Sequence, residues 1–325
     1  MSTFGEARFV LVTGKGGVGK TTFCAAEASA LAARGKRVLV AMCNAKERLS
    51  TLFGSAPIGH EVTPLADRIW AVNMVPERAI EEYGFLVLRN RALAKVLFDS
   101  KYVTSFLRAV PGMHEWAMLG KAWWHTTETL ADGSFKYDVV ILDAPATGHG
   151  LDMLRVPTVI LDVVPAGILR RDAERAWSLF RDPDACAIVA VTLPEEMPVT
   201  ETIELYRSLA QMGLSVRRVV ANAVLPALFS EVERAALEAL PSFEPRTPGE
   251  CALLAAKNRA TRERLQSEMI ERLSRELPVR PVVLPLLIED AVGRQAVSRL
   301  SACVSAWTDE AVEPPGRQAA KPSAV

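Results

Sequence analysis

The sequence predicts an α/β protein built on a doubly wound, mostly parallel β-sheet with helices on both faces and an added helical subdomain. Short runs rich in Val, Ile and Leu alternate along the chain with longer helical stretches. This alternation is typical of parallel sheets, whose strands are buried on both faces and joined by crossover helices. A glycine-rich loop that fits the phosphate-binding P-loop pattern stands between the first strand and the first helix, where such a loop belongs in this fold class.

The predicted elements follow in that order along the chain. The expected strands are residues 9–13, 36–43, 68–75, 135–144, 186–193, 215–224 and 280–287. The expected helical segments are residues 21–35, about 76–130 and about 230–276. Since no linker divides the chain, we predict one domain over residues 1–307 and a disordered tail at 308–325, which is rich in Pro, Ala and charge.

Composition excludes several classes of function. The chain has 325 residues, and its 38 basic and 38 acidic side chains balance, so nothing predicts a surface for nucleic acid or for an anionic membrane. Its most apolar stretch, residues 156–169, is too short to cross a bilayer, and we expect no direct membrane insertion. Five widely spaced cysteines without a C-x-x-C pair favour reduced thiols and a cytoplasmic location.

The loop between the first strand and the first helix reads GKGGVGKTT and satisfies G-x-x-x-x-G-K-S/T. Its backbone N–H groups and the helix dipole are expected to bind the phosphates of ATP. Lys20 is expected to reach the β- and γ-phosphates, and the Thr21 hydroxyl to ligate Mg²⁺. The expected nucleotide-binding residues here are Gly14, Gly16, Gly17, Val18, Gly19, Lys20, Thr21 and Thr22.

A second site element follows the strand at 135–144, which ends in VVILDAPATGHG. Asp143 closes this buried strand, so its carboxylate is expected to face the P-loop across the top of the sheet and to hold Mg²⁺ through water. Residues 144–149 are predicted to form a small turn that moves with the state of the γ-phosphate.

These motifs together resemble the arsenite-pump ATPase family, which also contains the ATPase that targets tail-anchored membrane proteins. The matching segments are the loop with its second lysine, Lys15, then ERLSTLFG at 47–54, DAPATGH at 143–149, and residues 180–202 and 284–300. The resemblance implies a Mg-ATP-dependent dimer in which Lys15 acts across the interface on the partner's nucleotide. It also implies that Asn222 reads the adenine base.

Three departures from the family pattern bear on function. The family's loop after the second strand starts with an Asp that activates the attacking water, and the corresponding residue here is Asn44. Asn orients water but takes no proton from it, so Asn44 predicts slow hydrolysis unless the nearby Glu47 substitutes. The metalloid-binding cysteines and the zinc C-x-x-C pair have no counterpart, and the segment after residue 150 lacks the Met-rich insert that covers a client groove.

The sequence thus predicts an ATPase switch, a homodimer or a heterodimer with a paralogous ATPase, that drives a conformational change in an unknown protein client. The alternatives are a non-hydrolysing ATP-binding scaffold paired with an active paralogue, a MinD/ParA-type positioning ATPase, and a kinase-like enzyme on the same fold. The stretch that contains Trp116, Trp123 and Trp124 is either core or a binding face.

Overall fold

The computed structural model describes residues 7–88, 112–288 and 293–307. An eight-stranded sheet lies at its centre, with the strand order β3-β4-β2-β5-β1-β6-β7-β8. All neighbouring strands in it run parallel except β3 and β4, which confirms the predicted fold class. The strands are β1 (Phe9–Thr13), β2 (Val38–Cys43), β3 (Thr63–Ala66), β4 (Ile69–Met74), β5 (Val139–Asp143), β6 (Cys186–Thr192), β7 (Val216–Val224) and β8 (Val282–Pro285).

The central strands form where the apolar runs lie, because both faces of the sheet are covered. Every residue of β1, β2, β5 and β6 is buried, as expected for continuous β-branched and aliphatic runs. The strand β3 was not predicted. It has four residues, TPLA, with one of them buried, and it pairs antiparallel at the edge of the sheet, where a proline is tolerated and no apolar pattern is required.

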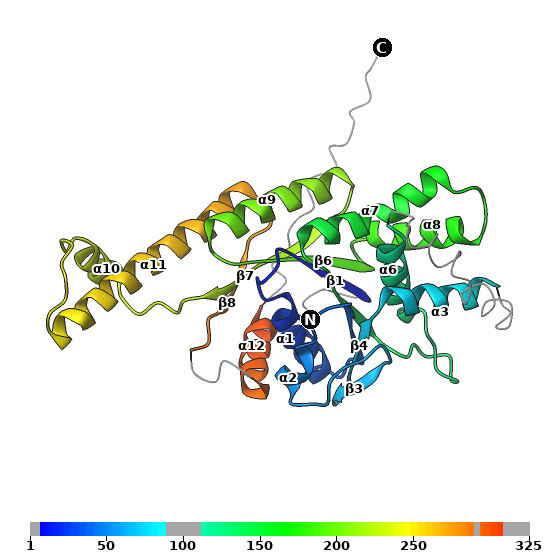
Figure 1. The fold of residues 1–325 in the computed structure, drawn as a ribbon, viewed down its shortest axis with the longest axis horizontal. Coiled ribbons are helices and arrows are strands. Elements are labelled where there is room, and N and C mark those ends of the chain that lie inside the picture. Colours follow the sequence, from blue (N-terminus) through cyan, green and yellow to red (C-terminus); the bar gives the residue numbers. More distant parts are fainter. Residues whose placement is uncertain (1–6, 89–111, 289–292, 308–325) are drawn as a thin grey trace, which may run out of the picture.

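Helices cover both faces of the sheet (Figure 1). They are α1 (Lys20–Ala33), α2 (Leu49–Phe53), α3 (Pro76–Leu88), α6 (Met113–His125), α7 (Thr147–Val163), α8 (Ile168–Arg181), α9 (Glu196–Gln211), α10 (Glu231–Glu238), α11 (Pro248–Glu276) and α12 (Arg294–Ala306). One core cluster joins α1, α2 and α12 to one face of the sheet. A second cluster joins α6, α7, α8 and α9 to the other face.

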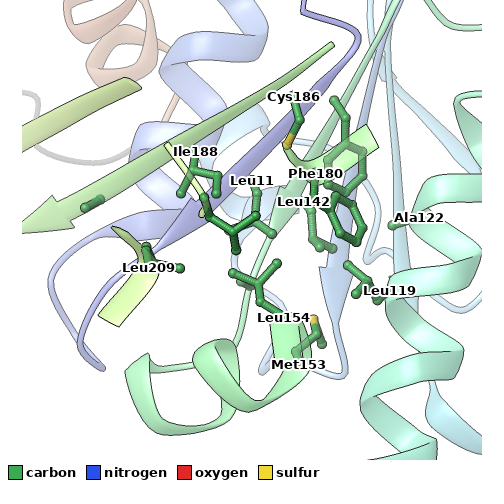
Figure 2. Packing of buried hydrophobic residues seen from close by; sticks show 14 of the residues in the cluster. Leu11, Leu119, Ala122, Leu142, Met153, Leu154, Phe180, Cys186, Ile188 and Leu209 are labelled. Atoms are coloured by element: carbon green, nitrogen blue, oxygen red, sulfur yellow. The ribbon is translucent and has the colours of Figure 1, made fainter. Parts of the chain in front are cut away.

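Figure 2 shows part of this second cluster, where side chains of adjacent strands meet those of the helices that cover them. Leu11, Leu142 and Ile188 come from β1, β5 and β6. Phe180, at the end of α8, packs against this layer, and its ring lies 5.6 Å from that of Phe9. The helices α7 and α8 thus pack directly on β1, the strand that leads into the P-loop, and on its neighbours.

The aromatic helix α6 belongs mainly to the core. Trp116 is 1% exposed, and Trp123 is half-buried against the second cluster. Trp124 is 37% exposed and lies beside the ring of His125. The helix ends at His125, earlier than the predicted helical block, because the chain turns there and Thr129 forms a bridge with Phe135.

The helices α10 and α11 extend away from the sheet (Figure 1). Each begins with a capping box, at Ser230 and at Thr247, which satisfies the first N–H groups of the helix. Glu263 of α11 is buried and accepts from Arg259 at 2.7 Å. This ion pair lies near the middle of α11, a helix with few buried residues.

Some predictions fall outside the described residues. The tail at 308–325 is one of them, as is the middle of the first helical block. Within the described part of the chain, no helix is both long and apolar enough to cross a membrane.

Candidate functional site

The candidate site lies at the carboxyl edge of the sheet, where the P-loop after β1 lies between the end of β5 and Asn222 of β7. The P-loop follows β1, the strand between β5 and β6. In the β1–β5 register, Val12 pairs with Asp143, so the last residue of β5 lies beside the start of the P-loop. Ligand sites of open α/β sheets occur at this edge.

Glycines are required at both ends of the P-loop because other atoms approach the backbone closely. A Cβ on Gly14 would lie 2.1 Å from the Val191 carbonyl oxygen of β6. A Cβ on Gly19 would lie 2.1 Å from Nδ2 of Asn222, and Gly19 also has a φ of 93°. Helix α1 begins directly after Gly19, without a side-chain cap on its first N–H groups. These groups are thus positioned for an anion.

The Lys20 ammonium group lies inside the curve of the loop. Its Nζ donates to the carbonyl oxygens of Gly14 at 2.9 Å and of Lys15 at 3.0 Å. Burial lowers the pKa of Lys20, and the negative charge of Asp143 opposes that shift. The ammonium group is therefore held where a phosphate bound to the loop would meet it.

Thr21 and Asp143 are brought together, as the sequence predicted for a shared cation. The Thr21 hydroxyl donates to Oδ2 of Asp143 at 2.6 Å. Burial raises the pKa of Asp143, and the Thr21 hydrogen bond and the Lys20 charge oppose this rise. A hydroxyl and a carboxylate at the mouth of a phosphate loop are hard oxygen ligands of the kind that Mg²⁺ prefers. The residues present thus fit Mg-ATP.

Asn222 of β7 lies against the P-loop. Its Nδ2 donates to the carbonyl oxygen of Val18 at 2.8 Å, and the residue is buried. This contact ties the loop to β7, so Asn222 supports the loop backbone. Its role at the adenine base stays a prediction.

The Lys15 side chain forms an ion pair within its own chain. Its Nζ contacts Oε1 of Glu201, in α9, at 2.5 Å. Glu201 lies in the segment 180–202 that resembles the family, but nothing in the sequence indicates that it pairs with a lysine 186 residues away.

The loop after β2 places Asn44 at the same edge of the sheet. Asn44 is exposed and has a φ of 44°, a left-handed conformation that Asn tolerates better than most residues. Glu47 is engaged elsewhere, because its carboxylate accepts from the backbone N–H of Ser50 at 2.7 Å and from its hydroxyl at 2.6 Å. Glu47 thus caps α2, and its use as a base would require that cap to open.

The loop after β5 is shorter than predicted. Helix α7 begins at Thr147, so only residues 144–146 lie outside regular structure, rather than 144–149. A Cβ on Gly150, in the first turn of α7, would lie 3.1 Å from the Pro145 carbonyl oxygen. A side chain at this position would therefore crowd the loop, which makes glycine the residue that fits here. The side chain of His149 is outside the described residues.

Sequence reasoning also missed Arg294, at the start of α12. Its Nε donates to the carbonyl oxygen of Phe53, at the end of α2. This bond ties the helix that follows Asn44 to the C-terminal helix. In the part of the chain that the structure describes, no group of three His, Cys, Asp or Glu side chains forms a potential metal site.

The chain is similar in sequence to known ATPases. The family model described as anion-transporting ATPase matches residues 7–168 and 168–306. The chain is 30% identical to the ATPase BagA of Mycobacterium tuberculosis over 70% of this chain and 68% of that protein. It is 26% identical to an arsenical pump-driving ATPase of Escherichia coli over 91% of this chain and 53% of that protein. It is also 24% identical to the ATPase GET3 of Kluyveromyces lactis, over 69% of this chain and 74% of that protein.

Proposed function

The chain belongs to the anion-transporting ATPase family, and from this premise we propose that it is a dimeric, Mg-ATP-dependent switch. The proposal rests on one observation above all. Lys20 lies within the loop formed by Gly14 and Lys15, and Thr21 contacts Asp143 at 2.6 Å. A cation suited to phosphate charge and two oxygen groups of the kind that Mg²⁺ prefers thus lie together at a helix N-terminus, which supports the proposal.

The proposed roles of these residues follow from their positions. The loop N–H groups bind phosphate, Lys20 neutralises charge on the β- and γ-phosphates, and Thr21 with Asp143 holds Mg²⁺. Mg²⁺, if held by Thr21 and Asp143, would withdraw charge from the bound phosphates. Asn222 supports the loop through Val18, and its proposed contact with the adenine base rests on the family resemblance alone.

Hydrolysis by this ATPase is proposed to be slow. Asn44 lies at the edge of the site without a carboxylate, and Glu47 is bound to Ser50. Loss of a general base costs roughly 10²–10⁴-fold in rate. The same observation favours the second candidate, a chain that binds ATP but depends on an active paralogue for turnover.

The switch itself is proposed to run through the two loops that border the phosphates. The loop after β2 leads into α2, and the loop after β5 leads into α7. Helix α7 packs on α6 and α8, so a shift at the loop would reach the helical face opposite α1. We place the unknown protein client on that face, and a second copy or a paralogous ATPase across the nucleotide site, where Lys15 would act in trans.

Calorimetry of Mg-ATP binding tests this proposal. Lys20→Ala should abolish measurable binding, because it removes the cation held inside the loop. Lys36→Ala is the matched control, since Lys36 precedes β2 at the opposite edge of the sheet, and it should bind as the wild type does. Equal affinity of Lys20→Ala and wild type would show that the P-loop assignment is wrong.

A further inference from the structure

The contact between Lys15 and Glu201 joins the P-loop to a helix that takes no other part in the proposed site. Lys15 Nζ and Glu201 Oε1 are 2.5 Å apart, and their side chains are 36% and 30% exposed. The pair is therefore charge-assisted and lies at the surface. Lys15 is the lysine proposed to act on the nucleotide of a second protomer. Its ion pair with Glu201 therefore bears on how dimer formation is controlled.

Glu201 is held in place by the packing of α9. The residues that follow it, Thr202 and Ile203, are buried, and the Thr202 hydroxyl donates to the Pro198 carbonyl oxygen at 2.8 Å. The P-loop is fixed on the other side, because Gly14 meets the Val191 carbonyl of β6. The carboxylate thus approaches Lys15 from a helix that is packed into the core on either side of Glu201.

This contact competes with the action of Lys15 in trans. An ammonium group paired with a carboxylate has its charge largely neutralised, whereas stabilisation of a transferring phosphoryl group needs that charge. A carboxylate carried along with Lys15 would also repel the partner's γ-phosphate. The ion pair must therefore open before Lys15 can serve the partner's site.

We propose that Glu201 is a positioning residue that holds Lys15 within its own protomer and so restrains nucleotide-dependent assembly with a second copy of the chain. This inference rests on the proposed function. The restraint is weak by construction, because both side chains are about one-third exposed. Exposed ion pairs of this kind change an equilibrium by about 1.4- to 5-fold each. With one pair in each protomer, a dimer constant would change by roughly 2- to 30-fold.

The test measures dimerisation of the full chain by analytical ultracentrifugation with Mg²⁺, ADP and aluminium fluoride, a mimic of the transferring phosphoryl group. Glu201→Gln should lower the dimer dissociation constant by roughly 2- to 30-fold, and the gain should shrink as salt rises. The matched control is Glu204→Gln, three residues along α9, which removes the same charge at an exposed position. It should leave the constant unchanged.

A double-mutant cycle with Lys15→Ala tests whether Glu201→Gln changes the dimer constant through Lys15. In the Lys15→Ala background, Glu201→Gln should change the dimer constant by less than about 2-fold. A full-sized effect there would overturn the proposal, as would no change or weaker assembly of the single Glu201→Gln variant. Wild type that binds Mg-ATP by calorimetry but never dimerises would also overturn it, leaving ATP binding intact. Failure of the ATP site itself appears separately, as a Lys20→Ala variant that binds Mg-ATP like wild type.

Discussion

The glycine that ends the P-loop offers a quantitative test of how the loop is built. Gly19 has a φ of 93°, and a Cβ there would lie 2.1 Å from Nδ2 and 3.3 Å from Cγ of Asn222. Gly19→Ala should therefore destabilise the protein through backbone strain and through overlap with one side chain. Gly14→Ala meets a backbone carbonyl instead, that of Val191, at the same 2.1 Å.

Backbone strain and overlap with Asn222 contribute different free energies to the cost of Gly19→Ala, and a second substitution can remove only the overlap. A left-handed conformation costs an L-residue about 1–2 kcal/mol, and overpacking adds about 1–3 kcal/mol. A smaller unfolded-state entropy returns about 0.4–1 kcal/mol, so Gly19→Ala should cost about 1–5 kcal/mol in all. Asn222→Ala removes the overlap but leaves the strain. In that background, Gly19→Ala should cost only about 0–2 kcal/mol.

The assay is urea unfolding of wild type, both single variants and the double variant, with Gly14→Ala and Gly14→Ala/Asn222→Ala as the matched pair. Asn222→Ala alone should cost about 1–3 kcal/mol, because it leaves the Val18 carbonyl without its donor. A coupling of about 1–3 kcal/mol between Gly19 and Asn222 is expected. No rescue by Asn222→Ala is expected for Gly14→Ala, since its closest overlap is with the Val191 backbone carbonyl and not with Asn222. Costs for Gly19→Ala and Asn222→Ala that add within about 0.5 kcal/mol would refute this description of the loop.

Three further predictions concern charge at the site. Lys15→Ala should leave Mg-ATP affinity nearly intact in calorimetry while it abolishes turnover and weakens the dimer. The reason is that a group acting on the transition state contributes little to ground-state binding. A fall in affinity as large as that of Lys20→Ala would show that Lys15 acts on the nucleotide of its own protomer. Asp143→Asn should raise the free energy of unfolding of the nucleotide-free chain by about 0.5–2 kcal/mol and remove the Mg²⁺ dependence of ATP binding. Burial raises the folded pKa of Asp143 above its ordinary value of 3.8. The destabilisation by its charge should therefore develop as pH rises from that value through the folded pKa, and a stability difference independent of pH would contradict this. Asn44→Asp should raise kcat by up to ~10²–10⁴-fold, whereas no gain, or a loss, would show that a carboxylate is not what limits hydrolysis.

The fold was predictable because each central strand is buried on both faces. The runs that form β1 and β6 contain no polar alternation, so their hydrophobicity alone marks them as strands of a covered parallel sheet. The edge strand β3 carries no such pattern, and its four residues with Pro64 could not be recognised from sequence. The end of α6 at His125 depended on a turn that only the folded chain defines.

The site was predictable where residues are close in sequence or lie at strand ends. The P-loop motif placed Lys20, and the position of Asp143 at the end of a buried strand placed its carboxylate beside Thr21. Contacts between distant elements were different. The pairing of Lys15 with Glu201 and the support of the loop by Asn222 depend on how β6 and β7 dock against β1, and no local pattern records that docking.

The strand order also explains how one phosphate group could influence both faces of the sheet. The neighbours β2 and β5 lie on one side of β1, so the loops after them border the P-loop together. The loop after β2 continues into α2, which Arg294 ties to α12 on one face. The loop after β5 continues into α7, which packs with α8 on the other face. A change at the γ-phosphate that moved these two loops would therefore be transmitted to α12 on one face and to α8 on the other. The ion pair between Lys15 of the P-loop and Glu201 would transmit the same change to α9, the helix that follows β6.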